Sequence, residues 1–135
     1  MEQLKNLANC KPIEFLRQTN RIKKAVEKWL TINEIISIRK QMPKLDEAMT
    51  KQQREEAVRK QSMENLSMIL DNCLDKHPEE TLEVIALCCF VEPEDANNHP
   101  MGVYLKAIAE MIADESVISF FTSLARLEQT NFLTV

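Results

Sequence analysis

The chain has 135 residues and a net charge of -4, and its 44% hydrophobic and 28% charged residues are ordinary for a globular protein. Its single glycine argues against tight β-hairpins and phosphate-binding loops, which depend on glycine, and favours helices joined by short connections. No signal sequence and no run of about 18 apolar residues is visible. We therefore expect a cytoplasmic protein without a membrane span, whose four cysteines are reduced thiols.

Charge is distributed unevenly along the chain. Residues 1–65 hold 14 basic against 9 acidic side chains, whereas residues 66–135 hold 3 basic against 12 acidic ones. A subunit with a basic part and an acidic part can bind a second copy head to tail, which closes rings or builds helical filaments. Two solvated faces of different charge are the alternative interpretation.

A first long helix is predicted from Pro12 to Leu30, because proline suits the first helical turn. Its apolar residues have helical spacing: Phe15, Ile22, Val26 and Trp29. A basic ridge at i, i+4, i+7 and i+11 lies on another face: Arg17, Arg21, Lys24 and Lys28. We interpret the ridge as a subunit contact, with a solvated face as the alternative. Nucleic-acid binding is disfavoured because no aromatic side chains alternate with the basic ones.

A second helix is predicted to begin with a capping box, in which Thr31 is the N-cap and Glu34 reaches back. It should run to about Gln41, because Pro43 stops it. A helix-turn-helix motif is disfavoured, since the turn lacks glycine and isoleucines occupy the positions where base-reading side chains are needed.

Residues 44–62 form the most polar segment, which we expect to be a solvated helix that could be mobile. From Met63 to about Lys76 the pattern becomes amphipathic. Its apolar stripe consists of Leu66, Ile69, Leu70, Cys73 and Leu74.

A central helix is predicted over residues 78–91, ended by Pro93. Apolar residues cover almost its whole circumference, so other helices should surround it. With a helix from Pro100 and a last helix capped by Asp114, the prediction is an all-α fold. We expect one compact domain, 1–135, of about six helices, with an apolar C-terminal tail at 130–135.

No chemical site is predicted. The cysteines and histidines lack metal-ligand spacing, and adjacent Cys88 and Cys89 point about 100° apart on a helix. No nucleophile, base and orienting acid are paired, and no nucleotide-binding loop is present. We therefore expect no catalytic residue, no cofactor and no metal, and not an enzyme. Candidate partner-binding residues are Tyr104, Phe121, Phe132 and Leu133, for which core packing is the alternative.

Four segments resemble the tail assembly chaperones of long-tailed bacteriophages and prophages. They are KPIEFLRQTN at 11–20, IRKQMPKL at 38–45, LDKHPEETL at 74–82 and FFTSLA at 120–125. The resemblance runs in order over most of the chain and matches the short form of these proteins. It implies a helical, self-associating protein of the bacterial host cytoplasm, absent from the finished virion.

The resemblance also implies binding of the helical tape measure protein, which such chaperones keep soluble during tail assembly. A longer, frameshifted form would recruit the tail tube protein. Two alternatives remain open: a small helical adaptor or regulator, and a DNA-binding regulator that uses the basic N-terminal half.

Overall fold

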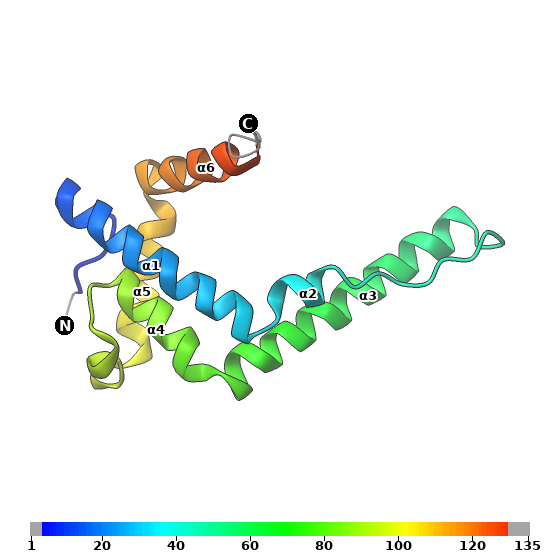
Figure 1. Ribbon diagram of the computed structural model, residues 1–135, viewed down its shortest axis with the longest axis horizontal. Helices are drawn as coiled ribbons and strands as arrows, with labels where there is room; N and C mark the ends of the chain where they lie inside the picture. Colours follow the sequence, from blue (N-terminus) through cyan, green and yellow to red (C-terminus); the bar gives the residue numbers. More distant parts are fainter. Residues whose placement is uncertain (1–3, 130–135) are drawn as a thin grey trace. The chain divides into compact units, whose positions relative to one another are not determined.

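The computed structural model describes residues 4–129, and it describes side chains up to residue 126 (Figure 1). Helices account for the regular structure of this part of the chain, and none of it is strand, so the all-α prediction is confirmed. Six α-helices, a π-helical turn and a 3₁₀ turn follow in the order α1 Pro12–Ile32, α2 Ile35–Arg39, α3 Lys51–Asp71, η1 Asn72–Lys76, α4 Pro78–Cys88, η2 Pro93–Asn98, α5 Met101–Ala113 and α6 Glu115–Gln129.

The chain divides into two compact units. The first takes in Met1–Ile22 and Ile85–Val135, and the second takes in Lys23–Val84. The boundaries fall inside α1 and α4, so each of these helices contributes to both units. The predicted tail at 130–135 lies outside the described residues.

The first unit has an apolar core with one aromatic residue at its centre. Tyr104 of α5 is fully buried, and its hydroxyl donates a hydrogen bond of 2.8 Å to the Ala96 carbonyl of η2. This bond satisfies the phenol, which would otherwise be costly to bury. The other buried apolar residues of this unit are Leu7, Ile22, Ala86, Leu87, Cys89, Val91, Ala96, Ala107, Met111 and Val117.

Helix α4 ends earlier than predicted, and Phe90 is the reason. Phe90 has a left-handed backbone with φ 58°, its N–H donates to Leu87 at 3.2 Å, and the Val91 N–H donates to Ala86 at 3.0 Å. These two bonds form a Schellman motif, which closes a helix before any proline is reached. The prediction of a helix to residue 91 was therefore wrong by one turn.

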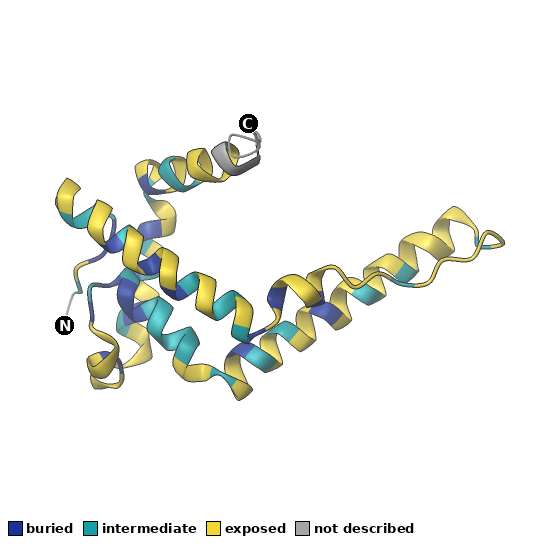
Figure 2. Ribbon diagram, in the orientation of Figure 1, coloured by how far each residue is buried: buried dark blue, intermediate teal, exposed yellow. Residues whose placement is uncertain are grey.

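Burial of α4 is also less complete than predicted. Ala86 and Leu87 are buried, whereas residues 82–85 are half-buried (Figure 2). Only the C-terminal part of the helix, together with Cys89 and Val91, belongs to a core. The sequence shows that the helix has apolar residues on nearly every side. It does not show that neighbouring helices cover only the C-terminal part of its length.

The second unit joins the end of α1, α2, α3 and the start of α4. The Asn72 amide donates to the Asn33 carbonyl at 2.9 Å, and the Asn65 amide donates to the Gln41 carbonyl at 3.1 Å. These bonds hold α2 and the connection after it alongside α3, as Figure 1 shows. The buried apolar residues of this unit are Ala25, Ile35, Ile38 and Cys73.

The capping box at Thr31 and Glu34 was wrong. Helix α1 continues to Ile32, and the Thr31 hydroxyl donates back to the Glu27 carbonyl at 2.9 Å. Glu34 has a left-handed backbone with φ 54° and makes no side-chain cap bond. A real capping box lies in the segment interpreted only as polar: Thr50 accepts from the Gln53 N–H at 3.1 Å, and the Gln53 side chain accepts from the Thr50 N–H at 2.9 Å.

Replacing Phe90 should reveal the cost of its left-handed backbone. Phe90→Ala and Phe90→Gly both remove the ring, which lies 5.3 Å below the Lys5 ammonium. In the alanine variant the left-handed backbone at residue 90 still costs roughly 1–2 kcal/mol. Glycine adopts this conformation without that cost, but it loses more conformational entropy on folding. We expect the glycine variant to be more stable than the alanine variant by about 1 kcal/mol in urea unfolding. An alanine variant of equal or greater stability would contradict this account of the helix end.

Candidate functional site

An apolar groove of about 490 Å³ lies in the first unit, between the start of α1 and the start of α6. Leu7, Cys10, Phe15, Val117 and Phe120 line it, together with Ala8, Pro12, Leu16, Asp114 and Ser116. Hydrophobic side chains thus dominate a hollow that is open to solvent, which is the composition of a binding site for an apolar partner surface.

Hydrogen bonds hold the residues on both sides of the groove in place. On the α6 side, Asp114 accepts a hydrogen bond of 3.1 Å from the Val117 N–H, so the predicted N-cap is confirmed. On the other side, fully buried Asn6 donates to Glu110 at 2.9 Å and accepts from the Ala8 N–H at 2.8 Å. These bonds hold the segment that carries Leu7 against α5.

Phe15 and Phe120 of the groove lining form an aromatic cluster with Phe121, which does not line the groove. The Phe15 and Phe120 centroids are 5.0 Å apart, Phe120 and Phe121 are 5.5 Å apart, and Phe15 and Phe121 are 6.3 Å apart. The first two pairs are edge-to-face, a geometry that stabilises an aromatic pair by about 0.5–1.5 kcal/mol, and the third pair is tilted. Leu16 of the groove lining is 57% exposed, and large apolar side chains of the same two helices are exposed as well: Ile13 of α1 at 59% and Ile118 of α6 at 45%.

The predicted partner-binding residues divide into three cases. Tyr104 was wrong as a surface residue, because its side chain is fully buried and its hydroxyl is bonded within the core. Phe121 is half-buried and belongs to the aromatic cluster. Phe132 and Leu133 lie outside the described residues. Sequence reasoning missed Ile13 and Leu16, although their i, i+3 spacing on a second face of α1 was a visible signal.

The basic ridge on α1 is exposed, but two of its members are paired. Arg21 donates two hydrogen bonds to Glu92, at 2.9 and 2.6 Å, and this contact lowers the pKa of the Glu92 carboxyl. Lys28 lies 3.6 Å from Glu83. Arg17 and Lys24 form no ion pair with the described residues.

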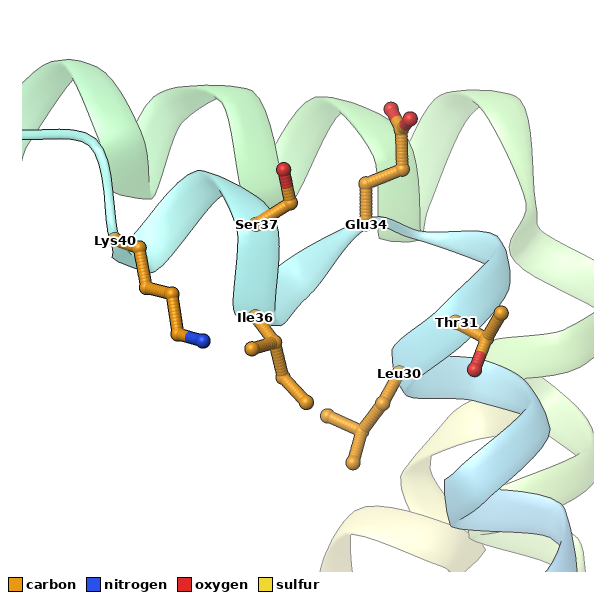
Figure 3. Close-up of a pocket in the computed structure, with 6 residues that line it drawn as sticks. All are labelled: Leu30, Thr31, Glu34, Ile36, Ser37 and Lys40. Atoms are coloured by element: carbon orange, nitrogen blue, oxygen red, sulfur yellow. The ribbon is translucent and has the colours of Figure 1, made fainter.

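A second hollow, of about 500 Å³, lies in the second unit beside α2 (Figure 3). Leu30 and Ile36 point toward each other, whereas Glu34 points away from them. Lys40 and the hydroxyls of Thr31 and Ser37 complete the lining. The Thr31 hydroxyl donates to the Glu27 carbonyl instead of to Glu34, so these two side chains are not arranged as a nucleophile and its base.

The thiols of Cys88 and Cys89 are protonated and therefore unreactive at neutral pH. Burial raises the pKa of Cys88 to about 11 and that of Cys89 to about 12, so both stay protonated, whereas nucleophiles and metal ligands are thiolates. All four cysteines are free. Within residues 4–129, no group of three His, Cys, Asp or Glu side chains could hold a metal ion.

No family model, curated protein or solved structure matches the chain. In the described part of the chain, every helix is too short or too polar to cross a bilayer.

Thiol chemistry offers a direct check of the burial pattern. At pH 8 we expect a disulfide reagent such as DTNB to label Cys10 first. Cys88 should react more slowly, because burial raises its pKa to about 11, and buried Cys73 and Cys89 should react only as the protein unfolds. The native Cys10→Ser variant should therefore lack the fast phase. A fast phase that persists in this variant would show that another thiol is more exposed or more acidic than the structure indicates.

Proposed function

We propose that the protein is a non-catalytic assembly chaperone whose groove binds an amphipathic helix of a longer partner, the tape measure protein of a phage tail. The observation that carries the proposal is the apolar groove, which Phe15, Phe120 and the exposed side chain of Leu16 line. Helix-in-groove binding needs an apolar hollow between helices that accepts side chains at i, i+3, i+4 and i+7.

The physical role follows from what such a groove does to its ligand. A long helical partner with an uncovered apolar stripe aggregates through that stripe. Docking the stripe against Phe15, Phe120 and Leu16 would remove it from water, at about 25 cal/mol per Å² of apolar surface. The partner then stays soluble until the contact is exchanged for one in the assembled tail.

The resemblance of residues 11–20, 38–45, 74–82 and 120–125 to tail assembly chaperones supports the choice of partner. On this proposal the protein acts in the cytoplasm of the bacterial host and is absent from the finished virion. A longer, frameshifted form would add the contact with the tube protein. Head-to-tail self-association through Arg17 and Lys24 belongs to the same proposal, because these charges have no described ion-pair partner.

An adaptor or regulator with a different helical partner would use the same groove, and the identity of the bound partner separates the two. DNA binding has less support, because Arg21 and Lys28 are paired with acids. Helix α2 also has only five residues, with Ile35 and Ile38 buried. A recognition helix needs a longer exposed face.

A pair of matched substitutions tests the groove. Leu16→Glu places a charge in the lining of the groove at a site that is 57% exposed, so the fold should survive. Leu105→Glu makes the same change on α5, at 56% exposure and outside the groove lining. On co-expression with the tape measure protein, the wild type and Leu105→Glu should keep the partner soluble, and Leu16→Glu should lose at least ten-fold in affinity.

Affinity is measured by isothermal titration with a purified tape measure fragment, after circular dichroism has shown that each variant is folded. Equal binding by the wild type and Leu16→Glu would remove the groove from the proposal. Loss of binding in Leu105→Glu alone would move the site to α5. A wild type that neither binds nor solubilises the partner would end the chaperone proposal.

A further inference from the structure

Helix α3 leaves an apolar stripe uncovered in the second unit. Met63 is 64% exposed, Leu66 50%, Leu70 47% and Leu74 64%. The opposite face of the helix packs within the unit, since Asn65 and Cys73 are buried. Figure 2 shows α3 exposed along most of its length. The predicted stripe was thus correct in its spacing, but most of it faces solvent.

The turn η1 extends this stripe beyond the α-helix. Its π-helical bond joins the His77 N–H to the Asn72 carbonyl at 2.8 Å. Within the turn, Cys73 is 4% exposed and Leu74 is 64% exposed, so successive side chains point to opposite environments. Met63, Leu66 and Leu70 have the i, i+3, i+7 spacing of a coiled-coil seam, which is narrower than the stripe of a helix buried in a globular core. In the π-helical turn Leu74, at i+11, takes the exposed place that residue 73, at i+10, would have in a regular seam.

Charge on the helix changes sign along the stripe. Residues 51–62 carry four basic side chains against two acidic ones, and residues 63–76 carry three acidic side chains against one basic one. Arg59 and Lys60 lie one turn before Met63, whereas Asp71 and Asp75 lie at the far end of the stripe. All four charged residues are exposed.

We propose that this stripe binds the same stripe of a second copy of the chain, antiparallel and related by a two-fold axis. In that arrangement Leu66 packs against Leu70 of the second copy, and Met63 packs against Leu74 of the second copy. The basic end of each helix then lies beside the acidic end of the other. A parallel pair would place Arg59 and Lys60 against their own copies, so the charge pattern selects the antiparallel pair.

The contact is small. Four apolar side chains and two charge pairs per copy bury less than the roughly 1,200 Å² at the low end of standard stable interfaces. We therefore expect a dimer that forms at micromolar rather than nanomolar concentration. This isologous contact differs from the head-to-tail contact through the basic ridge, because it closes at two subunits. The exposed residues of α5 carry no comparable reversal of charge beside them.

Sedimentation velocity of the full chain, between 1 and 200 μM in low salt, tests the proposal. The wild type should dimerise, and Leu66→Glu should raise the dissociation constant at least ten-fold. Glutamate is a good helix former, so α3 should remain folded, which circular dichroism checks. Leu105→Glu is the control and should dimerise like the wild type. A wild type that stays monomeric at 200 μM would overturn the proposal and leave the stripe to a different protein.

Charge exchange tests the antiparallel orientation. Arg59→Glu with Lys60→Glu makes both ends of the stripe acidic, and Asp71→Lys with Asp75→Lys makes both ends basic. Each double variant should be monomeric alone, and an equimolar mixture should dimerise, because every charged end again meets its opposite. Asp71 also lies 3.7 Å from Lys76, but an exposed pair of this kind stabilises the fold little. A double variant that alone dimerises as well as the wild type would exclude the antiparallel pairing, because only an antiparallel wild-type pair has opposite charges to lose.

The dimer proposal and the chaperone proposal fail separately. Leu66→Glu leaves the groove intact and should still bind a tape measure helix, whereas Leu16→Glu should still dimerise. Loss of both properties in either variant would show that the two surfaces are one, and would overturn the assignment of the α3 stripe to self-association.

Discussion

The end of α4 is the constraint on which the first unit depends. The chain must leave a helix here without a glycine, and Phe90 takes the left-handed conformation that glycine usually supplies. Contacts from α1 hold this turn in place: the buried Gln18 amide donates to the Leu87 carbonyl at 2.6 Å, and Arg21 binds Glu92 through two hydrogen bonds. Because Gln18 lies one turn after Phe15, the same contacts that close α4 also fix the part of α1 that lines the groove. The backbone strain at Phe90 is thereby linked to the shape of the candidate binding site.

Sixteen large hydrophobic side chains are exposed among the described residues. Scattered apolar residues are normal on a monomer, but here several of them form continuous surfaces with helical spacing. One surface adjoins an aromatic groove in the first unit, and the other is a straight stripe on α3 in the second unit. A concave surface suits a helix of a different protein, whereas a straight stripe with a reversal of charge is complementary to itself. The two shapes therefore favour two different partners.

Sequence periodicity predicted the helices well because helix formation is local. Pro12 and Asp114 begin helices where expected, since their effects act within one turn. Periodicity did not predict which apolar faces are covered. Leu66 and Leu70 fit a core stripe but are exposed, while the polar side chain of Asn65 is buried beside Gln41. Thr31 is not a cap, because its hydroxyl donates instead to the Glu27 carbonyl in the preceding turn of α1. Tyr104 failed as a surface residue because the carbonyl of Ala96, which no local pattern reveals, satisfies its hydroxyl inside the core.

A weak dimer would change how the groove works on a long partner. Each dimer carries two copies of the groove, and a tape measure protein offers many helical turns along one chain. On the proposed function, a dimer whose two grooves reach one partner would hold it more tightly than the monomer, because binding of the first groove gives the second a high effective concentration of its segment. That gain disappears when the dimer separates, because each groove then binds alone. If the protein is the proposed chaperone, a weak α3 contact would retain the partner strongly while the chains are concentrated on it, and would allow release as assembly displaces them one at a time.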